Sequence, residues 1–228
     1  MRTRAKQFRK GQLGWGVVTF LSVGVAMFSY RYLPAIGPRI PQILGNLFAR
    51  PWLDVHIAGA ATALLLGPLN FLPWIPRKAP AVHRWIGRVY IVACLIGGGG
   101  GFVLAFGSTA GPVATAGFGS LAVCWILANV QGWRLATEGR YADHGAWMIR
   151  SFAMTFAAVT LRLYLPLIPL FHVSFVEGYR AISFLAWVPN LILAEIWLRR
   201  RGSSRGDRRR IAPDTLDHGG EAVGALLG

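Results

Sequence analysis

Apolar residues along the chain fall into six continuous blocks, with no alternation at the two-residue period of a half-buried strand. Each block is close to the ~20 residues that a helix needs to cross a hydrocarbon layer of ~30 Å. Lipid admits only helices and closed barrels, because every backbone N–H and C=O must be satisfied internally. The pattern predicts an all-α integral membrane bundle of six transmembrane helices, over residues 14–30, 52–74, 86–106, 112–133, 146–168 and 181–198.

The segments outside the six blocks are polar and basic, and we expect no separate soluble domain. Residues 1–11 are a basic N-terminal segment, residues 12–198 the membrane domain, and residues 199–228 a basic tail that we expect to be disordered. Composition agrees, since 54% of the 228 residues are hydrophobic and only 14% are charged. The first block resembles a signal peptide, but it is long and lacks a small-residue cleavage site, so we expect an uncleaved first helix.

The formal net charge of +15 raises nucleic acid as a partner, and the placement of the basic residues argues against it. Of the 24 Lys and Arg residues, nineteen lie in the terminal segments or around the second and fourth connections, and four lie on the opposite side. The positive-inside rule then makes the richer side cytoplasmic, which also requires an even number of spans. We predict a cell (inner) membrane protein with both termini in the cytoplasm, its basic ends against anionic lipid headgroups, and no nucleic-acid partner.

Polar residues inside the spans are the candidate functional residues, since a charge near the bilayer centre costs at least ~2.5 kcal/mol. Three helix faces combine a histidine with small or polar residues when residues are placed 100° apart: His56, Gly59, Ala60, Ala63, Gly67 and Asn70; His83, Gly87, Tyr90, Cys94, Gly97 and Gly101; and His144, Ser151, Thr155 and Arg162. Small residues alone indicate close helix packing. The glycine run at residues 97–101 needs something large against its backbone, either a neighbouring helix or a flat cofactor.

The histidines are the sharper signal, because neutral imidazole is the commonest protein ligand for metals and haem iron. Helical bundles build such sites from facing helices. Spans three and five run in the same direction, which places His83 and His144 at one depth near the cytoplasmic side. His56 and His172 are matched near the external side, about 20–25 Å away. Two cofactors at these levels would relay an electron across the membrane; the alternative is that interfacial histidines only hydrogen-bond headgroups and loops.

Arginines accompany the inner histidines in the strings HRWIGR at residues 83–88 and HGAWMIR at residues 144–150. Arg84, Arg88 and Arg150 are candidate partners for haem propionates or for an anionic substrate, through charge-assisted hydrogen bonds. The alternative is ordinary snorkelling of basic side chains at a membrane interface.

Two ionisable residues lie within the later spans. Arg162, in the outer half of the fifth span, is expected to pair with Asp54 or with a backbone carbonyl. Glu195, near the inner end of the last span, is expected to pair with Arg88 or Arg150.

Four stretches of the sequence together resemble an uncharacterised group of bacterial six-span membrane proteins over about residues 50–198: HIAGAATALLLGPLNF, HRWIGRVY, HGAWMIRSFAMTFAAVTLRLYLP and WVPNLILAE. The group is a domain of unknown function and implies no activity. A more distant resemblance is to the transmembrane b-type cytochromes that use ascorbate as donor and bind two haems between histidines on four central helices. Because the fourth span has no histidine, this resemblance implies one inner haem held by His83 and His144, and an outer haem only with His172 as a substitute ligand.

Three functional hypotheses follow. The leading one is membrane electron transfer of the b-type cytochrome kind, which would make any enzyme activity that of an oxidoreductase; no metal other than haem iron is expected. The second is a small transporter, or a lipid- or small-molecule-binding protein without cofactor, with a polar cavity lined by Asn70, Gln131, Arg162, Asn190 and Glu195. The third is a structural subunit of a membrane complex. Hydrolysis and nucleotide chemistry are disfavoured, since the chain has no Ser–His–Asp set, no H-E-x-x-H and no phosphate-binding loop of the G-x-x-x-x-G-K-S/T type.

Overall fold

The computed structural model describes the backbone of residues 2–33 and 44–211, and the side chains of residues 12–33 and 44–201. Within these ranges the chain is helical with short turns and contains no strand. Six segments are long and apolar enough to cross a membrane: Gln12–Tyr30, Ala49–Asn70, Pro80–Phe106, Pro112–Thr137, Tyr141–Leu170 and Phe175–Arg201. The predicted all-α bundle of six spans is thereby confirmed.

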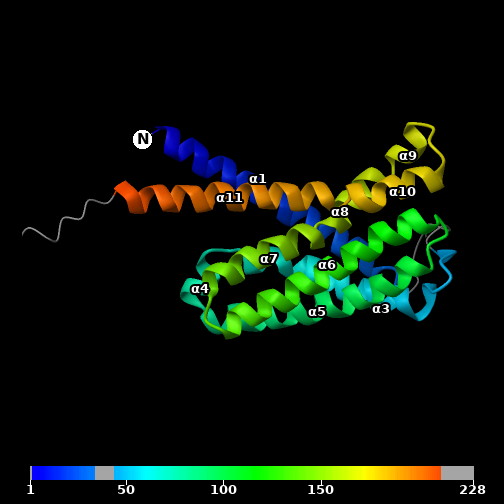
Figure 1. Cartoon of the computed structure of the whole chain (residues 1–228), viewed down its shortest axis with the longest axis horizontal. Helices are drawn as coiled ribbons and strands as arrows, with labels where there is room; N and C mark the ends of the chain where they lie inside the picture. The colour runs from blue at the N-terminus through cyan, green and yellow to red at the C-terminus, as the bar shows by residue number, and fades with distance from the viewer. Residues whose placement is uncertain (1, 34–43, 212–228) are drawn as a thin grey trace, which may run out of the picture.

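The helices of the described residues follow one another along the chain as α1 (Arg2–Tyr30), α3 (Ala49–Asn70), α4 (Trp74–Lys78), α5 (Pro80–Phe106), α6 (Pro112–Thr137), α7 (Tyr141–Thr155), α8 (Ala157–Tyr164), α9 (Leu167–Leu170), α10 (Phe175–Leu185) and α11 (Val188–Ile211) (Figure 1). Pro80 and Pro112 begin α5 and α6, at positions where the missing N–H has no helical partner to lose. Ser174 caps α10 by accepting a hydrogen bond from the backbone N–H of Glu177 at 3.3 Å.

Four helices form the centre of the bundle. α3 packs against α5, α5 against α6, and α6 against α7, while α1 lies on α3, α10 on α6 and α11 on α7. Figure 1 shows the start of α1, the end of α11 and the short helix α4 at one end of the bundle, and the α5–α6 and α9–α10 turns at the other. The two ends of the described chain therefore lie on the same side as the start of α5, where His83 is found.

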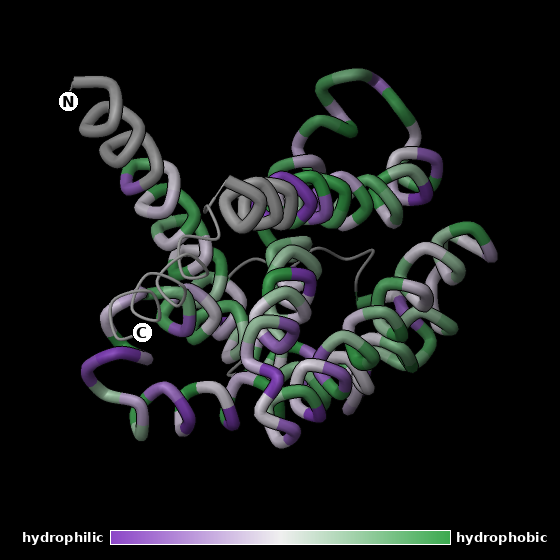
Figure 2. The backbone as a smooth tube through the Cα atoms, turned by 60° about the vertical axis from the view of Figure 1, so that its left-hand side comes forward, coloured by the Kyte–Doolittle hydropathy of each residue, from purple (hydrophilic) through white to green (hydrophobic). Residues whose placement is uncertain are grey.

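The outward faces of the spans are apolar, as lipid contact requires. Phe20 on α1 is 78% exposed and Leu193 on α11 is 66% exposed. Figure 2 shows mostly hydrophobic helix bodies, with the strongly hydrophilic stretches gathered towards helix ends and turns. This distribution is that of a membrane protein, whose spans present apolar side chains to the lipid.

α3 and α5 approach each other backbone to backbone, and this explains part of the glycine run. A Cβ added to Gly59 would overlap the backbone nitrogen of Gly97, and one added to Gly97 would lie 2.7 Å from the backbone nitrogen of Ala60. A Cβ on Gly100 would lie 2.9 Å from the backbone nitrogen of His56. Of the two explanations left open by the sequence, a neighbouring helix rather than a flat cofactor covers these glycines.

Several helix boundaries differ from the sequence expectation. The second span ends at Asn70, and Trp74, which the hydropathy pattern places in that span, begins the separate helix α4. Helix α1 begins at Arg2, within the basic N-terminal segment. Helix α11 continues to Ile211, through residues expected to be disordered from 199 onward. A helix already nucleated in the membrane adds one hydrogen bond for each further residue, so its extension is favoured over a fresh start. Residues 212–228 lie outside the described part of the chain.

Candidate functional site

The structure brings His83 on α5 and His144 on α7 together at the end of the bundle that carries α4. Both side chains are half-buried, and they lie near enough for the two imidazoles to interact electrostatically. The Nδ1 atom of His144 is 2.8 Å from the carbonyl oxygen of Gly132 on α6. Because a carbonyl only accepts, Nδ1 carries the proton and donates, which leaves the Nε2 lone pair of His144 free. This is the tautomer that a metal-ligating histidine adopts.

Two unpartnered polar atoms lie at the same corner. The Nδ1 atom of His83 and the Oδ1 atom of Asn70 are buried and hydrogen-bond to no described residue. Asn70, at the end of α3, faces Gly87, one helical turn after His83, since a Cβ on Gly87 would lie 3.8 Å from Asn70 Oδ1. An unsatisfied buried polar atom costs about 1–3 kcal/mol. This corner therefore has hydrogen-bonding capacity left for a bound group.

The three arginines beside the inner histidines differ in what they contact. Arg84 and Arg88 are exposed, and the Arg88 guanidinium lies 5.4 Å from the centre of the Trp85 ring. Arg150 is engaged with Glu195 on α11 through two hydrogen bonds, one from Nε and one from Nη2 at 3.1 Å. Of the two partners expected for Glu195, the structure selects Arg150 rather than Arg88. The exposed pair is thus better placed than Arg150 to meet an external anion.

The structure does not bring the two outer histidines together. His56 Nδ1 is 2.7 Å from the carbonyl oxygen of Gly97, so its ring lies inside the α3–α5 interface. A Cβ on Gly101 would stand 2.9 Å from the same ring nitrogen, which explains why glycine occupies that position. His172 follows α9 in a turn, with a φ of 55° and an exposed side chain. One histidine is locked between helices and the other faces outward.

Arg162 has the backbone partner expected from its position, but not the carboxylate. Its Nη1 donates to the carbonyl oxygen of Ala158 at 2.8 Å, and its Nη2 donates to Ser29 Oγ on α1, also at 2.8 Å. A turn at Phe156 separates α7 from α8. Phe156 keeps helical dihedrals, with φ −67° and ψ −12°, so α7 and α8 together form one span, Tyr141–Leu170.

A buried hydrogen-bond network in the bundle centre was not recognised from the sequence as a unit. The Tyr90 hydroxyl lies 2.9 Å from both Ser151 Oγ and Thr155 Oγ1. Trp125 Nε1 donates to Thr155 Oγ1 at 3.0 Å, and Ser151 Oγ donates to Asn129 Oδ1 at 3.0 Å. The five side chains join α5, α6 and α7, and all are buried. The sequence periodicity places Tyr90, Ser151 and Thr155 on inward helix faces. For Trp125 and Asn129, the only sequence feature that points to a shared face is their spacing of one helical turn on α6.

The five residues that the sequence predicts to line one polar cavity lie in different parts of the bundle. Asn190 donates to Thr160 Oγ1 at 3.1 Å, within the contact between α11 and the fifth span. Arg162 is bonded to α1 and Glu195 to Arg150, as described above. Asn70 lies at the end of α3, and Gln131 is half-buried on α6. Nothing in these contacts gathers the five around a common hollow.

Comparison with known families places the chain. A model of the family described as "Predicted membrane protein (DUF2306)" matches residues 53–198. The chain belongs to this family. The DUF2306 region contains His83, His144 and the whole Tyr90 network, while all of α1 and the end of α11 lie outside it. Among curated proteins and solved structures, none matches the chain. The resemblance to a six-span family of unknown function is confirmed, and the resemblance to b-type cytochromes stays a prediction.

Proposed function

We propose that this DUF2306 protein is a membrane electron-transfer protein that holds one b-type haem between His83 and His144. The observation that carries the proposal is the placement of two half-buried imidazoles, on the first turns of α5 and α7, near enough to interact electrostatically at one end of the bundle. Axial imidazoles from facing helices are a standard way for a helical bundle to hold haem iron. Within the described residues no group of three or more His, Cys, Asp or Glu side chains converges. The donor set therefore suits a haem, which His83 and His144 would hold, better than a bare metal ion.

The chemistry of the donor set fits this group. Gly132 fixes the ring of His144 through Nδ1 and directs the free Nε2 lone pair away from that bond. His83 retains an unpartnered Nδ1. A bound haem would supply one-electron chemistry, and the protein sets its orientation and electrostatics. Arg84 and Arg88 would bind the propionates, since neither is held by a carboxylate among the described residues, whereas Arg150 is already paired with Glu195.

The same proposal assigns a membrane and an orientation. The helix ends that carry most of the basic residues lie on the His83 side of the bundle (Figure 1). By the positive-inside rule this side would be the cytoplasmic face of the cell (inner) membrane, with the basic ends against anionic headgroups. The haem would then lie near the cytoplasmic surface, where a redox partner in the cytoplasm or the inner leaflet can reach it.

Histidine substitutions test the proposal. The full chain and its His83→Ala and His144→Ala variants would be expressed with ample haem and purified in detergent, and bound haem would be measured per chain as the pyridine haemochrome. We expect each substitution to remove most of the haem. The matched control is His172→Ala, which alters an exposed histidine in a turn and should leave haem content unchanged. Size-exclusion profiles and helical circular dichroism establish that the variants fold. Equal haem content in folded His144→Ala and the parent chain would overturn the assignment.

A further inference from the structure

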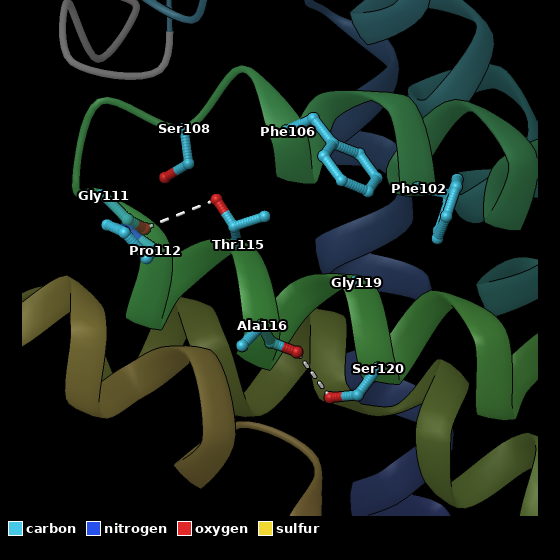
Figure 3. A pocket seen from close by; sticks show the side chains of 9 residues that line it. All are labelled: Phe102, Phe106, Ser108, Gly111, Pro112, Thr115, Ala116, Gly119 and Ser120. Carbon is cyan, nitrogen blue, oxygen red and sulfur yellow. Dashed lines mark hydrogen bonds between the residues drawn. The ribbon is translucent and has the colours of Figure 1, made fainter.

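An open groove of about 630 Å³ lies between the second half of α5 and the first half of α6, at the end of the bundle away from the His83 site (Figure 3). Phe102 and Phe106 project from α5 over one side, with ring centres 5.1 Å apart in an edge-to-face arrangement. Ala116 and Gly119 on α6 contribute little side-chain bulk to the other side. The groove thus lies on the outward face of two membrane spans and is walled mainly by carbon.

The hydroxyl groups that line the groove are engaged locally. Ser120 Oγ donates to the carbonyl oxygen of Ala116 at 2.7 Å, and Thr115 Oγ1 donates to that of Gly111 at 3.4 Å. Ser108 Oγ accepts from the backbone N–H of Ala110 at 3.4 Å. Bonds of this kind satisfy a hydroxyl within its own helix or turn. The groove therefore suits a hydrocarbon chain better than a polar ligand.

A basic side chain lies next to Gly111, the residue of the α5–α6 turn that lines the end of the groove, without itself lining it. Arg180 on α10 donates from Nε to the carbonyl oxygen of Ala110 at 2.7 Å. Its Nη2 atom lies beside Gly111, 3.3 Å from where a Cβ would stand. Gly111 has a φ of 83°, which glycine adopts without strain, and its missing Cβ leaves room for the guanidinium. None of the ion pairs among the described residues includes Arg180, which is half-buried, so its Nη groups have no carboxylate partner there.

We propose that the groove and Arg180 form a binding site for an anionic glycerophospholipid in the leaflet opposite the His83 side. One acyl chain lies along the groove against Phe102 and Phe106, and the phosphate accepts charge-assisted hydrogen bonds from Arg180. The two features match the two parts of such a lipid, since the guanidinium lies at the helix ends and the apolar groove extends from there along the spans. The site is separate from the proposed haem site and does not depend on it.

Photo-crosslinking tests where the acyl chain lies. The full chain would be reconstituted into phosphatidylcholine vesicles containing phosphatidylglycerol with a diazirine in its acyl chain, and labelled peptides would be mapped by mass spectrometry. We expect labelling within residues 102–120, and a loss of at least about fivefold in Ala116→Trp, which fills the groove from an exposed position. Val113→Trp is the matched control, since Val113 is exposed on the first turn of α6 and does not line the groove. Unchanged labelling in Ala116→Trp would overturn the proposal.

Headgroup preference tests the role of Arg180. Competition of unlabelled phosphatidylglycerol against unlabelled phosphatidylcholine should show a preference for the anionic lipid that falls about fivefold in Arg180→Gln, the equivalent of about 1 kcal/mol for one arginine near a membrane surface. Arg180→Lys keeps the charge and should retain most of the preference. If the parent chain shows no preference, or if Arg180→Gln retains it in full, the phosphate does not bind at Arg180.

Discussion

Single residues account for the polar interior of this bundle. Tyr90, Ser151 and Thr155 lie on helix faces that sequence periodicity turns inward, and they hydrogen-bond with Trp125 and Asn129 at 2.9 to 3.0 Å. Inside a membrane protein such bonds replace contacts that water would otherwise make. With every member satisfied, the network fixes the relative positions of α5, α6 and α7.

Removing one hydroxyl from this network should destabilise the protein even when the size of the side chain hardly changes. Thr155→Val keeps the side-chain shape but deprives Trp125 Nε1 of its acceptor. We expect a loss of about 1–3 kcal/mol, the usual cost of a buried polar group left without a partner. The free energy of unfolding would be measured by denaturant titration in detergent micelles. Thr137→Val is the control, because that hydroxyl is exposed at the end of α6, and a similar loss in both variants would contradict this account.

Helix elements are held together by two different means. α3 and α5 meet through glycine backbones, whereas α7 and α11 are joined by the ion pair of Arg150 with Glu195. The first arrangement leaves no room for added side-chain atoms, and its energy comes from close van der Waals contact. The glycines of α3 and α5 are therefore explained by the close approach of the two backbones, and Arg150 and Glu195 by their contact with each other across α7 and α11.

A glycine comparison tests the α3–α5 contact directly. Gly59→Ala should lower the free energy of unfolding by about 1–3 kcal/mol, because the new methyl group meets the α5 backbone, which cannot move aside cheaply. Gly99→Ala lies in the glycine run but meets nothing within 4 Å, and should be neutral or slightly stabilising, since alanine favours helix over glycine by about 1 kcal/mol. Thermal unfolding followed by circular dichroism would separate the two. Similar behaviour of both variants would show that the backbones are not in contact.

Hydropathy and periodicity predict helices well and their interruptions poorly. The six spans follow from apolar length, and an arginine partner for Glu195 follows from its depth, although the sequence does not distinguish Arg150 from Arg88. The boundary between α7 and α8 at Phe156 is not predictable, because the surrounding residues include neither Pro nor Gly. The pairing of Asn129 with Ser151 depends on how α6 is rotated against α7, which one helix's sequence does not determine. The continuation of α11 beyond the membrane is likewise missed by composition alone.

The whole molecule has two dissimilar ends. One carries the ends of the described chain and α4, and the other carries the α5–α6 and α9–α10 turns (Figure 1). His83 and His144, on the first turns of α5 and α7, belong to the first end. The basic residues concentrate on the first end. If the positive-inside rule applies, the proposed haem site faces the cytoplasm and the proposed lipid site faces the opposite leaflet.

Cysteine labelling in cells tests this orientation. Tyr141 and Val173 are exposed at opposite ends of the bundle, in the α6–α7 and α9–α10 regions. We expect a membrane-impermeant maleimide to label Val173→Cys in spheroplasts and to label Tyr141→Cys only after the membrane is opened. The parent chain, whose Cys94 is buried and whose Cys124 lies within α6, provides the background signal. The reverse pattern would invert the proposed topology.

The central claim is that His83 and His144 hold a haem, and the most direct measurement is the reduced-minus-oxidised absorption spectrum of the full chain, purified in detergent after expression with ample haem. The account predicts a shifted Soret band and a sharp α-band on reduction with dithionite, at close to one haem per chain. A folded, monodisperse preparation with neither spectral change would contradict it.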